Sequence, residues 1–387
     1  MNRVCSIFAQ LLQLFPRQEF QRAVEQHQAE RHARGFNSWT QFVSMMFCHL
    51  ANARSLREIC QGLAASEGKL THLGVSSPPS RSTLSYANEH RPWELYKTIF
   101  EKLLERCEAA ATGKKKFRFK NKLLSLDSTS IDLCAEVFDW AQYKSTKGAV
   151  KLHLVLDNEG YLPRFACITD GKTHDVTVGR TLRFEAGAIV VFDKGYVDYR
   201  WWKDMDEAGA YFVTRLKQDL KYEVLAEREV PQNRNVLRDR EVRIQSPRLD
   251  IDLRLRLVTI WDEEKQQELT FLTNHLKFGA TTIARIYKER WQIELFFKAL
   301  KQLLRVKTFV GTSPNALKTQ IWTALIAMLM VKYLQLKSSF GWSLSNLVAL
   351  LRQQLFVYRH LYKWLDDPFQ PPPALEGVHD AQIPLEF

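Results

Sequence analysis

Apolar side chains recur at helical spacing through the first part of the chain. A helical period or a capping pattern marks five stretches: 8–15, 39–50, 55–63, a short helix opened by Ser82-Thr83, and 92–107. Ser55 with Glu58 three residues later is a capping-box pattern, which satisfies free backbone donors at a helix start. Residues up to 113 are therefore predicted to be helical. Two interpretations stay open for them, a helix-turn-helix-like DNA-binding unit and a bundle with a structural role.

The pattern changes to strands after residue 122. Apolar or alternating runs predict strands at 123–126, 150–156, 162–169, 188–192 and 211–216, with helices after Asp175 and over 199–208. The turn Asp157-Asn158-Glu159-Gly160 joins the second and third strands in a hairpin. This order of elements predicts an α/β fold, a mixed sheet flanked by helices.

The last third of the chain begins with a further change of pattern. Residues 217–279 alternate like antiparallel strands and interrupt the α/β order, which predicts an all-β insertion. A strong amphipathic helix is predicted from Ala280 onward. The apolar run 321–331 is shorter than the ~20 residues of a membrane-spanning helix, so it predicts a buried core helix. The final residues, with Pro371-Pro372-Pro373, are expected to be extended or loosely ordered.

Composition adds a charge to this picture. The chain has 387 residues, with 55 Lys and Arg against 43 Asp and Glu and a net charge of +12. That excess favours a polyanionic partner such as nucleic acid or anionic lipid, although an ordinary basic cytoplasmic protein has a similar composition. The six cysteines form no CxxC pair, which argues against a cysteine zinc site and fits a reducing cytoplasm. No secretory signal, GxxxxGK[ST] loop or GxGxxG motif is present, so neither secretion nor a nucleotide cofactor is expected.

Six cations fall within nine residues where the strand-rich part begins: Lys114, Lys115, Lys116, Arg118, Lys120 and Lys122. Phe117 and Phe119 alternate with them, which predicts an extended segment that buries its rings and presents its cations on one side. Such a row of cations suits the phosphate backbone of DNA. A solvated charged face is the alternative.

Four polar residues share one face of the helix predicted from Ala280. At about 100° per residue, Tyr287, Arg290, Glu294 and Lys301 fall within an arc of about 60°. The adjacent face is apolar, so this polar stripe borders the core. Lys301 lies about 10 Å along the axis from Glu294 at ~1.5 Å per residue, too far for a simple ion pair. A shared anionic ligand therefore explains the stripe better than a row of solvent-exposed ion pairs.

Two aspartates complete a set of three carboxylates. Asp127 and Asp193 each follow an apolar strand, and strand ends are where sheet proteins commonly carry site residues. With Glu294 they supply hard oxygen ligands, which Mg²⁺ and Mn²⁺ prefer. Two such ions about 3.5–4 Å apart activate a nucleophile and stabilise a leaving oxygen at phosphorus.

These motifs resemble those of bacterial insertion-sequence transposases of the DDE type that carry a Tyr-Arg-Glu-Lys signature. The signature spacing is matched by Tyr287, Arg290, Glu294 and Lys301, the first aspartate by Leu-Asp127-Ser-Thr, and the second by Val-Phe-Asp193-Lys-Gly-Tyr. The segment Asp-Gly-Lys-Thr-His174-Asp175 also resembles one found between the two aspartates. We expect His174 to be structural and Asp175 to cap the helix that follows.

The resemblance implies a ribonuclease-H-like core in which Asp127, Asp193 and Glu294 are catalytic and bind two Mg²⁺ or Mn²⁺ ions. It also implies that the protein binds double-stranded DNA, both transposon terminal inverted repeats and target DNA, and forms a homodimer in the synaptic complex. The residues expected to contact DNA are Tyr287, Arg290, Lys301, Lys114, Lys115, Lys116, Arg118, Lys120 and Trp261. Trp261 is the candidate for holding a flipped base, and a core tryptophan of the insertion is the favoured alternative.

The resemblance further implies an order along the chain: a helical N-terminal DNA-binding region 1–113, a first core part 114–216, the β insertion 217–279, a second core part 280–340, and a C-terminal helix with a Pro-rich tail 341–387. The expected activity is cut-and-paste DNA transposition by metal-dependent hydrolysis and strand transfer, at the nucleoid of the bacterial cytoplasm. Two rivals stay open: a ribonuclease-H-like DNA nuclease that no longer transposes, and a DNA-binding relic with a dead core.

Overall fold

The first part of the chain is helical. The computed structural model describes residues 5–369, apart from 32, 34, 67, 114–115, 135–137, 139, 141, 145–146, 218, 233–234 and 305–308. The N-terminal helices are α1 (Ile7–Leu12), α2 (Arg17–Gln26), α3 (Ser38–Ala51), α4 (Leu56–Ala64), the 3-10 turn η1 (Leu70–Leu73), α5 (Arg81–His90) and α6 (Glu94–Ala111). The predicted capping box holds, because Ser55 Oγ accepts from Glu58 N and Glu58 Oε2 accepts from Arg54 N. The predicted start of α5 at Ser82 is wrong, since Ser80 Oγ accepts from Thr83 N and caps the helix.

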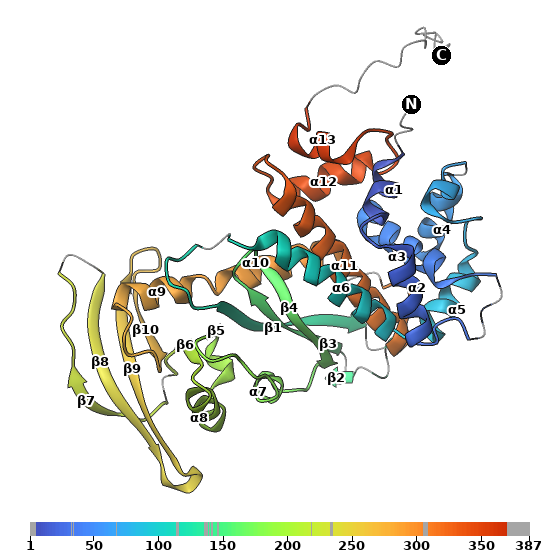
Figure 1. Cartoon of the computed structure of the whole chain (residues 1–387). Helices are drawn as coiled ribbons and strands as arrows, with labels where there is room; N and C mark the ends of the chain where they lie inside the picture. The colour runs from blue at the N-terminus through green and yellow to red at the C-terminus, as the bar shows by residue number, and fades with distance from the viewer. Residues whose placement is uncertain are drawn as a thin grey trace.

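Among the described residues, ten strands form one mixed sheet. Figure 1 shows this sheet crossing the molecule. Its strands are β1 (Leu123–Cys134), β2 (Gln142–Lys144), β3 (Lys147–Asp157), β4 (Leu162–Asp170), β5 (Ile189–Phe192), β6 (Tyr211–Arg215), β7 (Glu223–Glu227), β8 (Val236–Ser246), β9 (Ile251–Asp262) and β10 (Gln267–Thr273). The order is β2-β3-β1-β5-β6-β10-β9-β8-β7, with β4 also paired to β3. β5 is parallel to β1 and β6, and the other pairings are antiparallel. The predicted α/β fold with a mixed sheet and flanking helices is confirmed.

The β-rich stretch after β6 extends this sheet. β10 pairs antiparallel with β6, with Phe271 opposite Arg215, and β9, β8 and β7 follow outward. These strands form the curved left end of the sheet in Figure 1. Inside this end, Arg256 Nε and Nη2 donate to the two carboxylate oxygens of Asp239 at 2.7 and 2.6 Å, and both side chains are buried. The bidentate geometry compensates the cost of burying both charges.

The remaining helices pack on the sheet and against the N-terminal helices. They are α7 (Asp175–Gly179), η3 (Lys194–Tyr196), α8 (Tyr199–Glu207), η4 (Pro247–Leu249), α9 (Ala280–Lys288), α10 (Trp291–Leu304), α11 (Pro314–Lys337), α12 (Leu344–Gln354) and α13 (Leu361–Asp366). α11 is the predicted buried helix and contacts α3, α5, α6 and α10. In the described part of the chain no helix has the length and apolarity needed to span a membrane.

The two faces of β1 pack against different helices. Leu126 belongs to a core cluster with Trp201 and Trp202 of α8. Ile131 belongs to a larger cluster that includes Ile293 of α10 and the N-terminal helices. Successive side chains of a strand point to opposite faces, so odd-numbered residues of β1 face α10 and even-numbered ones face the α7–α8 side.

Candidate active site

The pairing of β1 with β5 brings two aspartates together. The strands run parallel in register from Leu123 opposite Ile189 to Leu126 opposite Phe192. Asp127 and Asp193 are each the next residue, so they leave this paired region side by side. β5 ends there, and Asp193 Oδ1 accepts a hydrogen bond from Gly195 N at 2.5 Å.

β1 itself does not end at Asp127, so that prediction is wrong. Residues 127–134 continue as a strand because β3 supplies backbone partners for them, with Asp127 opposite Leu154 and Cys134 opposite Lys147. The polar run Ser128-Thr129-Ser130 has no apolar pattern that would mark it as a strand. Asp127 therefore lies within a long strand, at the point where its neighbour on one side stops.

Arg290 joins Asp127 to Glu294. Its Nη1 donates to Asp127 Oδ2 at 3.0 Å and its Nη2 donates to Glu294 Oε1 at 2.5 Å. The side chains of Asp127 and Arg290 are largely buried, and that of Glu294 is 32% exposed. One carboxylate comes from the sheet and the other from α10, so a single cation holds the helix against the sheet at this point.

The carboxylates share a poorly solvated space. Burial raises the pKa of Asp127 to about 6, and the nearby Asp193 and Glu294 raise it as well. The N–H of Ser128, 2.8 Å from Asp127 Oδ1, and the Arg290 guanidinium act in the opposite direction. Burial likewise raises the pKa of Tyr196, and the carboxylates of Asp175, Asp127 and Asp193 contribute to that rise.

The predicted single helix from Ala280 is two helices. α9 ends at Lys288 and α10 begins at Trp291, and Arg290 N bonds to Tyr287 O in a tight i to i−3 turn. The turn interrupts the helix between Tyr287 and Glu294, but both side chains lie beside Arg290. The Tyr287 ring packs on Phe271 of β10, 4.8 Å between centroids, and lies 5.7 Å from the Arg290 guanidinium. Lys301 lies on α10, partly exposed, and forms no ion pair with any described residue.

The sequence did not reveal the role of Glu289 at this junction. Its side chain is 7% exposed, Lys116 Nζ lies 2.6 Å from Oε1, and the Tyr161 hydroxyl donates to Oε2 at 3.1 Å. The junction is thus tied both to the basic segment before β1 and to the turn between β3 and β4. In the sequence, Glu289 is only one more charged residue between Tyr287 and Arg290. Exposed helices commonly carry such residues, so nothing marked it as buried.

Asp175 also has a role other than the predicted one. His174 occupies the N-cap position of α7 without a side-chain capping bond, and Asp175 lies in the first turn. The Asp175 side chain instead accepts from Ser128 Oγ at 2.7 Å and from Lys151 Nζ at 3.2 Å. Long-range partners on β1 and β3 therefore replace the local cap.

The site fits a hard divalent cation in donor type. Asp127 and Glu294 already share one cation, the Arg290 guanidinium, and Asp193 is near enough to affect the pKa of Asp127. Within the described ranges, no three Asp, Glu, His or Cys side chains are gathered closely enough to hold a metal ion. A metal ion bound by both Asp127 and Glu294 would have to take one or both carboxylates from Arg290.

Comparison with known proteins decides the family. Residues 118–330, more than half of the chain, match the model described as the transposase DDE domain. The chain belongs to the DDE transposase family. A protein of Sinorhizobium fredii named as the transposase y4zB is 35% identical over 262 residues, which cover 66% of this chain and 71% of the relative. A second relative, from Geobacillus stearothermophilus, is named as the transposase for insertion sequence element IS5377 and is 29% identical. The match covers 68% of this chain and 70% of the relative.

The protein is thus an insertion-sequence DNA transposase of bacterial type, an enzyme that cleaves and transfers DNA strands. Among solved structures, a piggyBac transposase in its synaptic complex with hairpin DNA matches with a TM-score of 0.45 and 11% identity, covering 98% of this chain and 88% of that one.

The basic segment of the transposase partly follows its prediction. Arg118 and Lys120 are exposed, and the rings of Phe117 and Phe119 between them are partly buried and stacked at 4.8 Å. The segment runs through bends, so it is not the extended segment that was predicted. Lys116 is engaged by Glu289. Lys114 and Lys115 lie outside the described residues.

Trp261 of the transposase is on the surface. Its side chain is 37% exposed near the end of β9, and its backbone N–H donates to Asn235 O at 2.8 Å. The favoured expectation of a core tryptophan is therefore wrong. The prediction that it contacts DNA stays a prediction.

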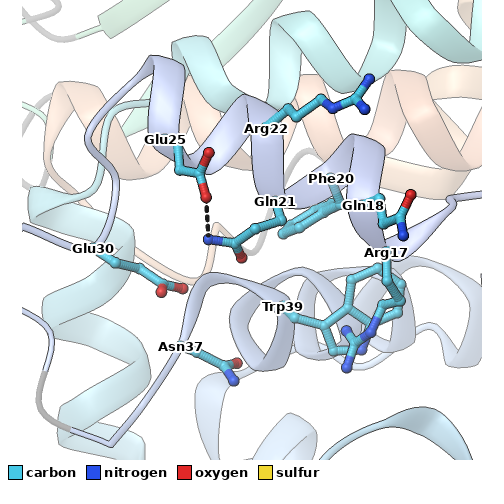
Figure 2. Close-up of a pocket in the computed structure, with 9 residues that line it drawn as sticks. All are labelled: Arg17, Gln18, Phe20, Gln21, Arg22, Glu25, Glu30, Asn37 and Trp39. Atoms are coloured by element: carbon cyan, nitrogen blue, oxygen red, sulfur yellow. Dashed lines mark hydrogen bonds between the residues drawn. The ribbon is translucent and has the colours of Figure 1, made fainter.

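A separate hollow of about 630 Å³ lies between α2 and the start of α3 (Figure 2). Arg17 lies over the ring of Trp39 at 3.8 Å, and Gln21 donates to Glu25 at 3.2 Å. Its residues fall within 4–76, which match a family model described as a domain of unknown function. The hollow contains none of the three carboxylates of the candidate active site.

Proposed function

We propose that this transposase moves an insertion sequence by a cut-and-paste pathway, with Asp127, Asp193 and Glu294 as its catalytic and metal-binding residues. The DDE family generally uses divalent metal ions, and we assign two Mg²⁺ or Mn²⁺ ions to these carboxylates. The observation that carries the proposal is the single guanidinium of Arg290 shared by Asp127 and Glu294. Two carboxylates from different elements that share one cation are positioned to share another.

The residues divide the work between binding and chemistry. When bound, divalent ions supply activation of the attacking oxygen and charge stabilisation at phosphorus. Asp127, Asp193 and Glu294 hold them, and the buried setting strengthens each charge interaction. Arg290, once released from the carboxylates, has its five N–H donors free for a phosphate. We also assign Tyr287 and Lys301, as members of the Tyr-Arg-Glu-Lys signature, to DNA phosphates near the cleaved end.

We assign the rest of the chain to DNA binding and assembly. Arg118 and Lys120, with Lys114, Lys115 and Lys116, would lie along the duplex backbone, and Trp261 would hold a flipped base. The core is assigned the ribonuclease-H-like fold and residues 1–113 a DNA-binding domain, within the five-part division of the chain given above. The partners are terminal inverted repeats and target DNA, in a homodimeric synaptic complex at the nucleoid of the bacterial cytoplasm.

A single carboxylate substitution tests the assignment. E294Q should abolish cleavage of the element's own ends in Mg²⁺, because an amide oxygen is a weak ligand for a hard cation. Binding of the same DNA should be retained within a few fold. The matched control is E101Q, an exposed glutamate of α6 that pairs only with Lys97 among the described residues. Full cleavage by E294Q would overturn the assignment of this residue.

The rival functions are separated by the DNA that flanks the gene. Short terminal inverted repeats bracketed by a target duplication support a mobile element. Their absence, together with cleavage of unrelated DNA by the purified protein, would favour the nuclease. Absence of both would favour a DNA-binding relic.

A further inference from the structure

Asp127 lies where β1 has lost one of its two neighbours. Up to Leu126 the strand has β5 on one side and β3 on the other, but β5 ends at Phe192. Beyond that point β3 alone provides backbone pairing for β1. A strand paired on one side has more freedom to shift, and a metal ligand must be held within about 0.5 Å of its productive position. The β1–β3 ladder therefore holds β1 on one side only at Asp127.

Asp175 contacts the strand immediately behind Asp127. Ser128 is the next residue and points to the opposite face of β1, where its Oγ donates to Asp175 Oδ1 at 2.7 Å. The N–H of the same Ser128 donates to Asp127 Oδ1 at 2.8 Å. Ser128 thus touches both carboxylates, one through its side chain and one through its backbone.

Asp175 is itself fixed by β3. Lys151 Nζ lies 3.2 Å from Asp175 Oδ1 and also donates to Thr173 O at 2.8 Å. The buried ring of His153, the cross-strand partner of Ser128, has Nδ1 3.8 Å from Asp175 Oδ1 and Nε2 2.9 Å from Thr169 Oγ1. The Lys151 cation offsets the charge of Asp175, so Asp175 does not add an unpaired negative charge beside Asp127.

We propose that Asp175 is a positioning residue that holds Asp127, through Ser128, in the geometry that binds the divalent metal. This inference rests on the proposed function, because it takes Asp127 as a metal ligand. Asp175 connects α7 to β1 at the position where β5 no longer pairs with β1. Groups hydrogen-bonded directly to metal ligands commonly change metal affinity by about 10- to 100-fold when they are removed. Asp175 bonds to Ser128 rather than to Asp127 itself, so we expect the lower end of this range.

Mn²⁺ binding to the full-length protein without DNA tests the proposal. Free Mn²⁺ measured by electron paramagnetic resonance gives the dissociation constant without any catalytic step. D175A should weaken Mn²⁺ binding about 10-fold. D175N should restore most of it, because the amide oxygen can still accept from Ser128 Oγ. S128A should weaken Mn²⁺ binding about as much as D175A does. The double variant should bind Mn²⁺ only slightly more weakly than either single variant, because the two residues belong to one hydrogen-bond network.

The control is D132N, an exposed aspartate of the same strand, which should bind Mn²⁺ as the wild type does. If D175A is poorly folded by circular dichroism, S128A and D175N provide the comparison instead. Wild-type Mn²⁺ affinity in folded D175A and S128A would overturn the proposal. So would an equal loss in D175A and D175N. D127N distinguishes failure of the proposed function from failure of the role of Asp175. If D127N leaves Mn²⁺ binding unchanged, the proposed function fails. If D127N weakens Mn²⁺ binding but D175A and S128A do not, only the role of Asp175 fails.

Discussion

Leu126 of β1 lies opposite Phe192 of β5 in parallel register, and this pairing sets the positions of Asp127 and Asp193. Both side chains before the aspartates are fully buried. A slip of one residue would send one aspartate to the other face of the sheet and expose a row of apolar side chains. The hydrophobic pairing that stabilises the sheet therefore also fixes the two carboxylates of the candidate site.

Arg290 occupies the space between two proposed metal ligands, so its removal should favour metal binding and impair the reaction. In R290Q we expect the Mn²⁺ dissociation constant of the DNA-free protein to fall about 10-fold, equivalent to about 1.4 kcal/mol. Cleavage of the element's ends should fall, because a phosphate contact is lost as well. Mn²⁺ titration and a cleavage assay check the two effects. Unchanged or weaker Mn²⁺ binding in R290Q would contradict the competition between the guanidinium and the metal.

The pKa of Asp127 predicts how metal-free stability depends on pH. The carboxyl titrates near 6 in the folded protein against its usual 3.8, so folding favours the protonated form. The contribution of Asp127 to the free energy of unfolding is then fully present below about pH 4. This contribution, about 2–3 kcal/mol, is lost as the pH rises through 6. D127N cannot ionise and should melt at a higher temperature than the wild type at pH 7.5 in EDTA. The difference should vanish at pH 4; an equal difference at both values would show that ionisation is not its cause.

Lys116 and Arg118 are neighbours in one basic run but should behave differently. K116M removes the cation next to the buried Glu289 carboxylate and should lower the free energy of unfolding by about 1–2 kcal/mol. R118M should leave stability nearly unchanged and reduce the slope of log K against log salt for duplex DNA by about 0.9. Melting curves and salt titrations of DNA binding separate the two. K363M, which removes a lysine from α13, is the control for the loss of one positive charge. A large loss of stability in R118M would contradict the different roles given to Lys116 and Arg118.

The buried pair Arg256–Asp239 anchors the β7–β10 end of the sheet to the start of α9. Arg256 also donates to the carbonyl oxygens of Leu276 and Phe278, just before that helix. D239A should destabilise the protein by about 3–5 kcal/mol, since it leaves a buried guanidinium partly unpaired. The double variant R256M/D239L should recover part of the loss, because no charge is left unpaired but the carbonyl oxygens of Leu276 and Phe278 lose their donor. Chemical denaturation measures both, and a double variant no better than D239A would argue against an unpaired charge as the cause.

Several elements could be predicted from local pattern alone. The capping box at Ser55, the hairpin around residues 157–160 and the buried helix that contains Ile321 follow from periods and turn residues a few positions apart. The candidate carboxylates could be named because their strands and helix have strong patterns, and the spacing around Glu294 resembles that of the family to which the chain belongs. Such signals are local because backbone geometry relates residues within a few turns.

Tertiary structure decided the rest. Strand β1 continues past Asp127 only because β3 lies beside it, and α9 stops before Arg290 at a junction where Glu289 is held by Lys116 and Tyr161. Asp175 contacts Ser128 rather than capping its own helix. Each of these outcomes depends on a partner far away in the sequence, and burial makes that partner's charge or hydrogen bond worth more than the local alternative. Sequence periodicity therefore located most of the helices and strands, whereas the packing of distant segments decided where β1 and α9 end and which polar side chains meet.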